Sequence, residues 1–463
     1  MRSAIILAFT ILFTLPQSSG AAGTYSFPRP ADMEHQIRFW KNIFTLYSQD
    51  QIVVHDTADL DRVYTVLDFR SYAAAGMTEP EIEPYKKAGA EAEEARLKDL
   101  FMRLQAGTPR ASLAPADQRI YDLFKNDPDP YKFQRAADDR RLRWQHGIRE
   151  RFGSGYRLAR RYFPDMERIF IEEGLPPELT RLPLIESCFN VDAYSKVGAT
   201  GIWQFMPGTG RLYMTVNGSV DERRDPIAST RAAARFLTAS YSRLGSWPLA
   251  ITAYNHGPAG VARGVEQTGR TDISSLIRYY DGPGWGFSSR NFYAEFLAAL
   301  EIDKNADTYF GRWPKETLPP TRTVMLDRPV DIFSAAQIAR IDRNGLADMN
   351  PALMEPVVSG RTPIPAGYGL RVPADGADGF TSRLAQVAPA DDRVARATPP
   401  DPPGDSARRA APPSTTHRVK AGQTLTGIAE QYGISVDALC TANGLNARSQ
   451  VRRGQVLRIP RDT

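Results

Sequence analysis

The chain has 463 residues, a length that accommodates about two or three domains and at least one sizeable hydrophobic core. Hydrophobic residues make up 42% of the sequence and charged residues 24%, values that are ordinary for a globular protein. The net charge of +5 is mild for this length, and no basic block with interleaved aromatic residues occurs, so no nucleic acid is expected as a partner.

Residues 1–22 have the features of a secretory signal peptide. Arg2 supplies a positive charge, residues 5–15 form an apolar run too short to span a bilayer, and small residues at 20–22 suit cleavage. An uncleaved membrane anchor is the alternative. We therefore expect export to the periplasm or cell envelope, with membrane association that is peripheral or through an uncleaved N-terminus. Nothing in the sequence indicates an oligomeric state.

Residues 23–165 are predicted to form a helical N-terminal region. Residues 79–105 are rich in Ala, Glu, Lys and Leu and are a good helix candidate. The arginine-rich run 140–161 is also expected to be helical, with Leu142, Trp144 and Phe152 on its buried face. Its arginines are interpreted as a solvated helix face, and an electrostatic guide for a substrate is the alternative.

A carboxylate interrupts an apolar stripe in the stretch Leu175 to Gly210. Leu179, Leu182 and Glu186 fall at i, i+3 and i+7, which is one face of a helix expected to end near Ser187. Burial and the negative end of a helix both disfavour ionisation, so the pKa of Glu186 should be raised. A carboxylic acid that stays protonated near neutral pH can serve as a general acid. The structural alternative is a buried glutamate that is paired with an arginine or bonded to the backbone.

The segment after Glu186 is rich in glycine and holds Trp203, Gln204, Phe205 and Met206. Glycine lets backbone approach a ligand closely, and an aromatic face beside amide groups suits a sugar ring. A glycine-rich turn with core aromatics is the alternative.

Two further helices are expected downstream of this segment. The first lies between Asp225 and Gly245, and the second begins at Pro248 and closes at Gly257 with the sequence AYNHG. A third helix is predicted over 291–303. Its Tyr293 lies on the apolar stripe and should point inward.

Three motifs together resemble a known family: Glu186-Ser187, GATGIWQFMP at 198–207 and AYNHG at 253–257. They look like those of the soluble-lytic-transglycosylase domain, most closely in membrane-bound lytic murein transglycosylases of the D type. The resemblance implies a mainly α fold with a lysozyme-like catalytic domain at 166–311 and Glu186 as the catalytic acid. The family has a serine where this chain has His256. The residues implied to bind the sugar are Ser187, Gly201, Trp203, Gln204, Met206, Tyr254, Asn255 and Tyr293.

The C-terminal residues 415–461 have the order strand, helix, helix, strand and resemble the LysM module, a small α+β (βααβ) fold that binds N-acetylglucosamine polymers. Gln423 stands where an acidic residue is usual. Residues 312–373 show a similar order and are interpreted as a degenerate LysM-like segment. The Pro- and Ala-rich residues 374–414 are expected to be a disordered linker. By resemblance, the glycan-binding positions of the module are Gly422, Gln423, Thr424, Leu425, Thr426, Asn443, Gly444 and Leu445.

The two cysteines and the histidines offer no further chemistry. Cys188 and Cys440 belong to different expected domains, so a disulfide is not expected, and Cys188 is interpreted as a packing residue instead of a nucleophile. No His-x-x-x-His or Cys-x-x-Cys spacing occurs, and we expect neither a metal nor another cofactor.

The family mechanism uses one residue twice, whereas an ordinary glycosidase needs two carboxylates. The resemblance implies that Glu186 protonates the linkage between N-acetylmuramic acid and N-acetylglucosamine and then deprotonates the muramic 6-hydroxyl, closing a 1,6-anhydro ring. The chain is thus expected to be a peptidoglycan lytic transglycosylase whose partner is the glycan strand. A hydrolytic muramidase and a non-catalytic wall-binding scaffold are the alternatives.

Overall fold

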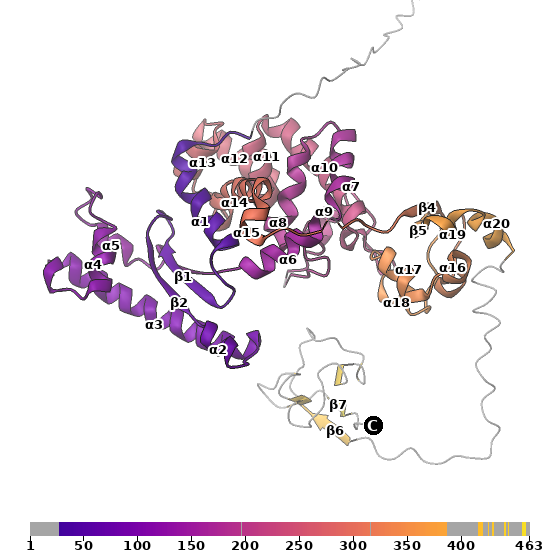
Figure 1. Ribbon diagram of the computed structural model, residues 1–463, viewed down its shortest axis with the longest axis horizontal. Helices are drawn as coiled ribbons and strands as arrows, with labels where there is room; N and C mark the ends of the chain where they lie inside the picture. Colours follow the sequence, from indigo (N-terminus) through magenta and orange to yellow (C-terminus); the bar gives the residue numbers. More distant parts are fainter. Residues whose placement is uncertain are drawn as a thin grey trace, which may run out of the picture. The chain divides into compact units, whose positions relative to one another are not determined.

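The computed structural model describes residues 27–195, 197–314, 316–386, 415–419 and 456–459, together with residues 425, 428–429, 439–440 and 443. These residues fall in two compact units, 1–390 and 391–463. The first unit is mainly helical, as the sequence predicts, and its buried hydrophobic residues gather in separate clusters around three groups of elements (Figure 1). The predicted signal peptide lies outside the described residues.

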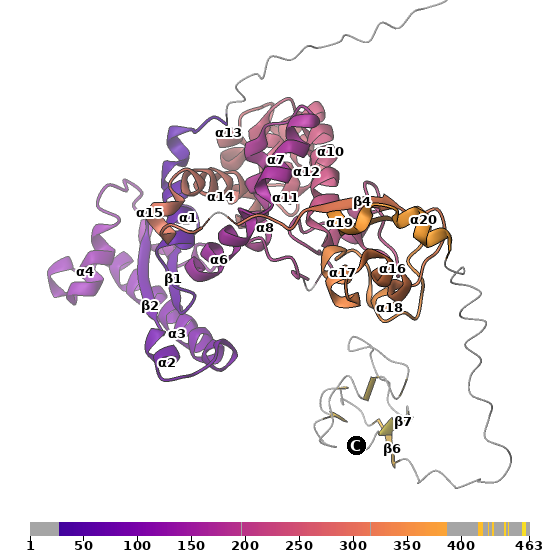
Figure 2. The same cartoon turned by 45° about the vertical axis from the view of Figure 1, so that its right-hand side comes forward.

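A bundle of helices around α14 (Phe287–Lys304) holds the largest cluster. α14 packs against α1, α8 and α11, and Figures 1 and 2 both place it inside the surrounding helices. Two of the expected helices are present with their predicted ends. Asp225 caps α10 by accepting from the N–H groups of Ile227 and Ala228, and Gly245 ends it in the left-handed conformation. The other bundle elements are η1 (Ala31–Met33), α1 (Glu34–Thr45), α6 (Arg149–Ala159), α7 (Phe163–Glu172), η3 (Pro177–Arg181), α8 (Leu182–Ser187), α9 (Pro207–Gly210), η4 (Glu222–Arg224), α10 (Pro226–Leu244), α11 (Trp247–His256), α12 (Pro258–Thr268), α13 (Ile273–Tyr279) and α15 (Ala306–Phe310).

The predicted boundary between the N-terminal region and the catalytic domain divides a single hydrophobic core. Trp40 of α1 and Phe152 of α6 belong to the same cluster as the helices that follow residue 166. The Trp40 indole N–H also donates to Asn291 of α14 at 3.1 Å. The helical bundle therefore begins well before residue 166.

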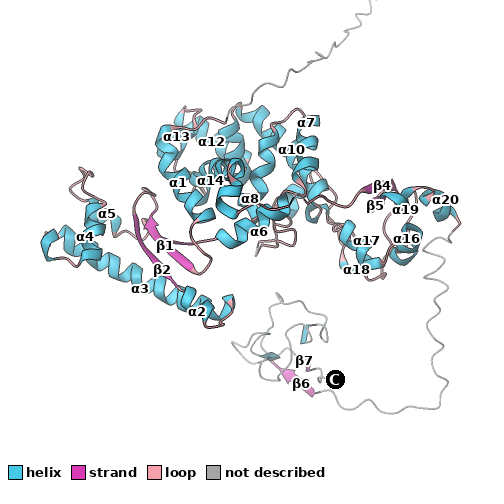
Figure 3. Cartoon of the chain, in the orientation of Figure 1, coloured by secondary structure: helices cyan, strands magenta, loops and turns pink. Residues whose placement is uncertain are grey.

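The N-terminal region was predicted to be helical, but part of it forms a three-stranded antiparallel sheet with the strand order β2-β1-β3. β1 (Gln51–Asp56) and β2 (Val63–Asp68) contain the β-branched runs that favour strands, and Figure 3 shows them beside the long helix α3. β3 (Leu142–His146) lies within the run predicted to be helical, and its pairing with β1 overrides the local helix propensity. The helices of this region are α2 (Arg70–Ala74), α3 (Glu79–Gln105), η2 (Arg110–Ser112), α4 (Pro115–Asp122) and α5 (Lys132–Ala136).

Residues 321–386 form a third cluster that is attached to the bundle. The strand–helix–helix–strand order predicted here is present, and β4 pairs antiparallel with β5. Its identity as a LysM-like unit stays a prediction. Arg371 of β5 pairs with Asp225, the cap of α10, which ties this cluster to the bundle. The elements are β4 (Thr321–Met325), α16 (Ile332–Ala339), α17 (Arg343–Met349), α18 (Glu355–Val358), β5 (Gly369–Pro373), α19 (Ala374–Ala377) and α20 (Phe380–Ala385).

The predicted linker begins later than residue 374. Residues 374–377 and 380–385 form α19 and α20, and the side chains of Phe380 and Leu384 are buried in the third cluster. These two apolar residues supply the buried surface that the rest of the predicted linker lacks. Residues 387–414 lie outside the described residues.

In the second unit, β6 (Thr415–Arg418) and β7 (Val456–Ile459) form an antiparallel pair. A small core of buried side chains accompanies them and includes Val419, Ile428 and Leu439. These outer strands match the first and last elements of the predicted βααβ module.

Across the described residues, no helix combines the length and the apolar character required to cross a membrane.

Candidate active site

Glu186 lies in the last turn of α8, a six-residue helix that follows the 3-10 helix η3. Buried Leu182 and Leu184 fix this helix on the core, and Glu186 itself stays partly exposed. The helix ends at Cys188, which adopts the left-handed conformation with φ of 50° and donates its N–H to the Pro183 carbonyl. The sharp reversal places the end of α8 against α6.

Glycine is required where α6 meets this reversal. A Cβ atom at Gly155 would lie 1.7 Å from the carbonyl oxygen of Cys188, far inside contact distance. Only glycine lets the two backbones approach this closely. The last turn of α8, and with it Glu186, therefore has a fixed position in the bundle.

The carboxyl group of Glu186 favours its neutral form. Burial raises its pKa from 4.5 to about 8, so the group is mostly protonated at neutral pH. This is the protonation state predicted from the apolar stripe in the sequence. The pKa of the Tyr254 hydroxyl is raised well above its usual value, first by burial and then by the charge of Glu186.

A second carboxyl group, Glu295 of α14, acts on the same site. Its pKa is also raised to about 8, mainly by burial and further by repulsion from Glu186, whereas Arg143 opposes the rise. Repulsion between like charges is reciprocal, so the two carboxyl groups cannot both ionise easily. Glu295 is not among the residues predicted from the sequence. Its signal was a single acidic residue inside the apolar run FYAEFLAAL, the same anomaly that marks Glu186.

Hydrogen bonds join the glycine-rich segment to α8 and α11. The Ser187 hydroxyl donates to the Ile202 carbonyl at 2.9 Å, and the Tyr254 hydroxyl donates to the Trp203 carbonyl at 2.9 Å. The Gln204 side chain donates to the Gly201 carbonyl at 2.8 Å, which closes the turn. Ser187, Gln204 and Tyr254 are thus brought together around the end of α8, as predicted. Met206, at the start of α9, is exposed.

A buried ion pair holds the glycine-rich segment in place. The Arg223 guanidinium donates to the carbonyls of Gly198 at 2.8 Å and Phe205 at 3.0 Å, and it forms a two-point ion pair with Asp221. The Gly201 backbone lies so close that a Cβ atom there would be 1.9 Å from the Arg223 carbonyl oxygen. Arg223 was also missed, because a charged residue in a turn gives no sign of burial in the sequence.

Three predicted sugar contacts are structural residues instead. Trp203 is fully buried, stacks on Phe170 with ring centroids 5.9 Å apart, and donates its indole N–H to Thr230. Gly201 is buried, and its backbone lies against the backbone of Arg223. Tyr293 is 1% exposed, and its hydroxyl donates to the Pro28 carbonyl at 2.7 Å. Contacts with residues that are distant in the sequence determine the surroundings of all three residues.

Asn255 and His256 form one wall of an open cavity of about 450 Å³. Asn255 is exposed and accepts a hydrogen bond from the Ser289 hydroxyl at 3.0 Å. The predicted role of Asn255 as a cleft residue therefore fits its position at the C-terminal end of α11, one residue after Tyr254.

Only two of the predicted glycan-binding positions of the C-terminal module are described. Leu425 is 5% exposed and belongs to the core of the second unit, so its predicted role as a contact residue is wrong. The Asn443 side chain donates to the Leu439 carbonyl at 2.8 Å. The positions outside the described residues are Gly422, Gln423, Thr424, Thr426, Gly444 and Leu445.

Comparisons with known proteins agree with these motifs. The transglycosylase SLT domain matches residues 171–277, and the LysM domain matches residues 417–460. Two curated relatives are the membrane-bound lytic murein transglycosylases D of Escherichia coli strain K12 and of Escherichia coli O6:H1, each 30% identical over 300 residues. The match covers 62% of this chain, which spans 61% of the length of each relative.

A solved structure also matches part of the chain. It is the X-ray structure of an inactive mutant of the lytic transglycosylase Slt from Pseudomonas aeruginosa, with 23% identity and a TM-score of 0.27. The match covers 47% of this chain and 34% of the other. The motifs around Glu186 thus lie in a range, 171–277, that matches the transglycosylase SLT domain, residues 417–460 match the LysM domain, and the chain is similar to membrane-bound lytic murein transglycosylase D over 300 residues.

Proposed function

We propose that this protein is a lytic transglycosylase that cleaves the β-1,4 bond between N-acetylmuramic acid and N-acetylglucosamine in peptidoglycan. The observation that carries the proposal is the neutral Glu186 carboxyl group beside Tyr254 and the glycine-rich segment. Both the SLT match around Glu186 and the relatives' printed activity support it. The expected location is the periplasm, where peptidoglycan is found.

In the proposed reaction, protonated Glu186 gives its proton to the bridging oxygen as the glycosidic bond breaks. The acetamide of the substrate stabilises the positive charge that develops on the muramic sugar. The Glu186 carboxylate then takes the proton from the 6-hydroxyl, whose oxygen bonds to the anomeric carbon and forms the 1,6-anhydro ring. Protons balance because Glu186 returns to its neutral form, and no water is consumed.

A hydrolytic muramidase is the second candidate, because Glu295 provides another carboxyl group near Glu186. The raised pKa of Glu295, about 8, favours the lytic reaction, since a neutral carboxylic acid is neither a nucleophile nor a base. Mass analysis of products from purified peptidoglycan tests the choice. Anhydro ends support the proposal, and ends that are one water heavier support the muramidase.

The pH dependence of cleavage should follow the raised pKa of Glu186. The proton donor is competent in its neutral form, so kcat/KM should hold steady below pH 8 and fall as the pH rises through about 8. An ordinary glutamate would lose this form above its usual pKa of 4.5. Rates on soluble glycan fragments over this range measure the effect, and a decline that is complete by pH 6 would contradict the proposed acid.

Removing the LysM module should weaken binding to the cell wall without changing the rate of cleavage. A variant that lacks Thr416 to Thr463 keeps the whole bundle around Glu186 and loses residues 417–460 that match LysM. Pull-down with insoluble peptidoglycan should show much weaker retention, while cleavage of short soluble glycans stays close to that of the full chain. Undiminished retention would assign wall binding to the first unit.

A further inference from the structure

Two adjoining cavities lie between the C-terminal end of α11 and the N-terminal sheet. The smaller cavity, of about 450 Å³, lies beside Asn255 and His256. The larger, of about 1010 Å³, lies between the sheet region and the helices α13 and α14. Arg143, Gly286 and Phe287 line both cavities, so the two spaces meet at these residues.

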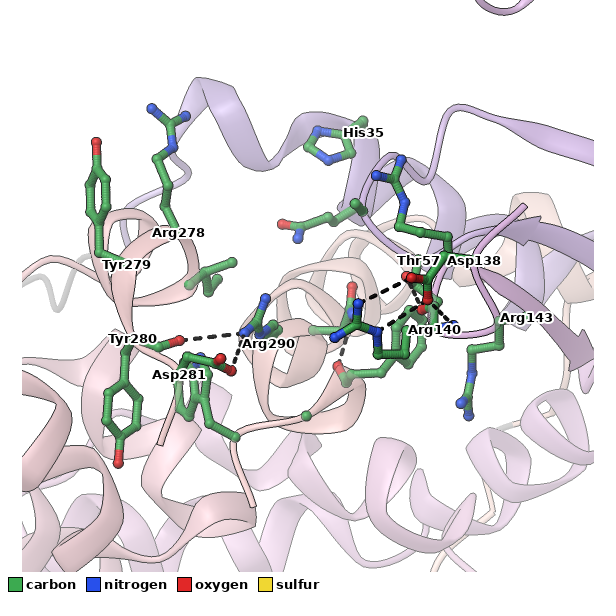
Figure 4. A pocket seen from close by; sticks show the side chains of 18 of the residues that line it. His35, Thr57, Asp138, Arg140, Arg143, Arg278, Tyr279, Tyr280, Asp281 and Arg290 are labelled. Carbon is green, nitrogen blue, oxygen red and sulfur yellow. Dashed lines mark hydrogen bonds and ion pairs between the residues drawn. The ribbon is translucent and has the colours of Figure 1, made fainter. Parts of the chain in front are cut away.

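Most of the arginines that line the larger cavity are already neutralised. In Figure 4, Arg140 points to Asp138, and Arg290 points to Asp281 and the Tyr280 carbonyl. Arg143 lies apart from Arg140, and its guanidinium points away from Asp138. The complete set of ion pairs formed by these arginines is Arg135–Asp129, Arg140–Asp138, Arg141–Asp56, Arg278–Asp32 and Arg290–Asp281.

Arg143 and Arg263 are the two arginines that line the smaller cavity, and Glu295 is the carboxyl group that interacts electrostatically with Arg143. Neither forms an ion pair with a carboxylate in the described part of the chain. Arg143 is held in place by the pairing of β3 with β1 and by its guanidinium, which lies 4.5 Å from the centroid of the Phe287 ring. Arg263 is exposed on α12, and its charge acts on His256.

The smaller cavity therefore has the chemistry of an anion site. Its lining includes Ser288, Ser289, Asn255 and two arginines that form no ion pair within the described residues, and no Asp or Glu is among its lining residues. Arginine forks bind planar carboxylates through two parallel hydrogen bonds. Asn255 of this cavity directly follows Tyr254, whose hydroxyl interacts with Glu186, so the cavity adjoins the candidate active site. In peptidoglycan, peptide stems that carry several carboxylates branch from the muramic residues.

We propose that Arg143 and Arg263 bind the carboxylates of acidic peptide stems, so that the protein prefers stem-bearing glycan strands to bare ones. This inference rests on the function proposed above. Arg143 reaches the site from the N-terminal sheet, which gives this part of the chain a role in choosing the substrate. The stem would extend from the smaller cavity into the larger one.

The test compares glycan strands with intact stems and the same strands after an amidase has removed the stems. The measured quantity is the ratio of kcat/KM for stem-bearing over bare strands. The wild type should favour stem-bearing strands, and the ratio should fall by about tenfold in Arg143→Gln/Arg263→Gln, as expected for loss of charge-assisted hydrogen bonds. Arg243→Gln, at an exposed position on α10 outside both cavities, should keep the wild-type ratio.

Each outcome decides the proposal. An unchanged ratio in the double variant, or no preference in the wild type, would overturn stem recognition while leaving the cleavage activity in place. No cleavage of either substrate by the wild type would instead contradict the proposed function itself. If the double variant does not fold, Arg263→Gln alone carries the test, because its side chain is exposed on α12 and should show a smaller fall in the same direction.

Discussion

Replacing Glu186 by glutamine should abolish cleavage while leaving the fold intact. Glutamine has nearly the same shape but cannot donate or accept the catalytic proton. A general acid contributes about 10²–10⁴-fold in rate, and Glu186 is used in both proton transfers, so kcat should fall by at least about 10³-fold. Chromatography of the soluble products from purified peptidoglycan measures the loss.

Binding and stability supply the control for this variant. Retention on insoluble peptidoglycan should be unchanged, and the thermal midpoint should be equal to that of the wild type or higher. A higher midpoint is expected above about pH 4.5, because the carboxyl group ionises in the unfolded chain but stays neutral in the folded one until the pH reaches about 8, and glutamine removes this penalty. Turnover close to that of the wild type would refute the assignment of Glu186.

Replacing Arg223 by alanine should cause the largest loss of stability among the site residues. The guanidinium is buried, pairs with Asp221, and donates to two carbonyls of the glycine-rich segment. Its removal leaves the buried Asp221 carboxylate without a positively charged partner, a change that costs about 3–5 kcal/mol in the free energy of unfolding. Urea unfolding followed by circular dichroism measures the change.

Two further variants distinguish this role from a general effect of charge. Arg211→Ala removes an exposed arginine nearby and should change the free energy of unfolding by less than about 0.5 kcal/mol. Asp221→Ala combined with Arg223→Ala should cost less than the sum of the two single changes, since no charge is then left unpaired. Additive losses would show that the pair does not act as a unit.

Local signals in the sequence predicted much of the bundle. Asp225 before a proline and Gly245 after an apolar stripe defined α10, and the carboxylate on an apolar stripe at Glu186 indicated the raised pKa that the structure shows. These features depend on the nearest few residues, which is why the pattern alone revealed them. The same holds for the motif order that led to the SLT and LysM families.

The incorrect predictions depended on partners remote in sequence. β3 was assigned to a helix although Leu142 and Trp144 are two residues apart, a strand spacing, because the pairing with β1 was not visible. Trp203 was predicted to contact a sugar, but its ring stacks on Phe170 in the core. Tyr293 points inward as predicted, but its hydroxyl donates a hydrogen bond to the Pro28 carbonyl of the N-terminal segment.

The site also depends on a neighbour that no motif contains. Repulsion from Glu186 adds to the raised pKa of Glu295, and Arg143 from the N-terminal sheet opposes this rise. This chain of charges joins α8, α14 and β3, three elements well separated in sequence. The environment of the acid is thus a property of the fold, whereas the acid itself can be read from the sequence.

The central claim is that the Glu186 carboxyl group is neutral at neutral pH. A titration of the glutamate carboxyl carbons by ¹³C NMR tests it, with Glu186→Gln to assign the signal. The account predicts a midpoint near 8 in the wild type, because burial disfavours the charged form. A Glu186 signal that titrates near the ordinary value of 4.5 would contradict it.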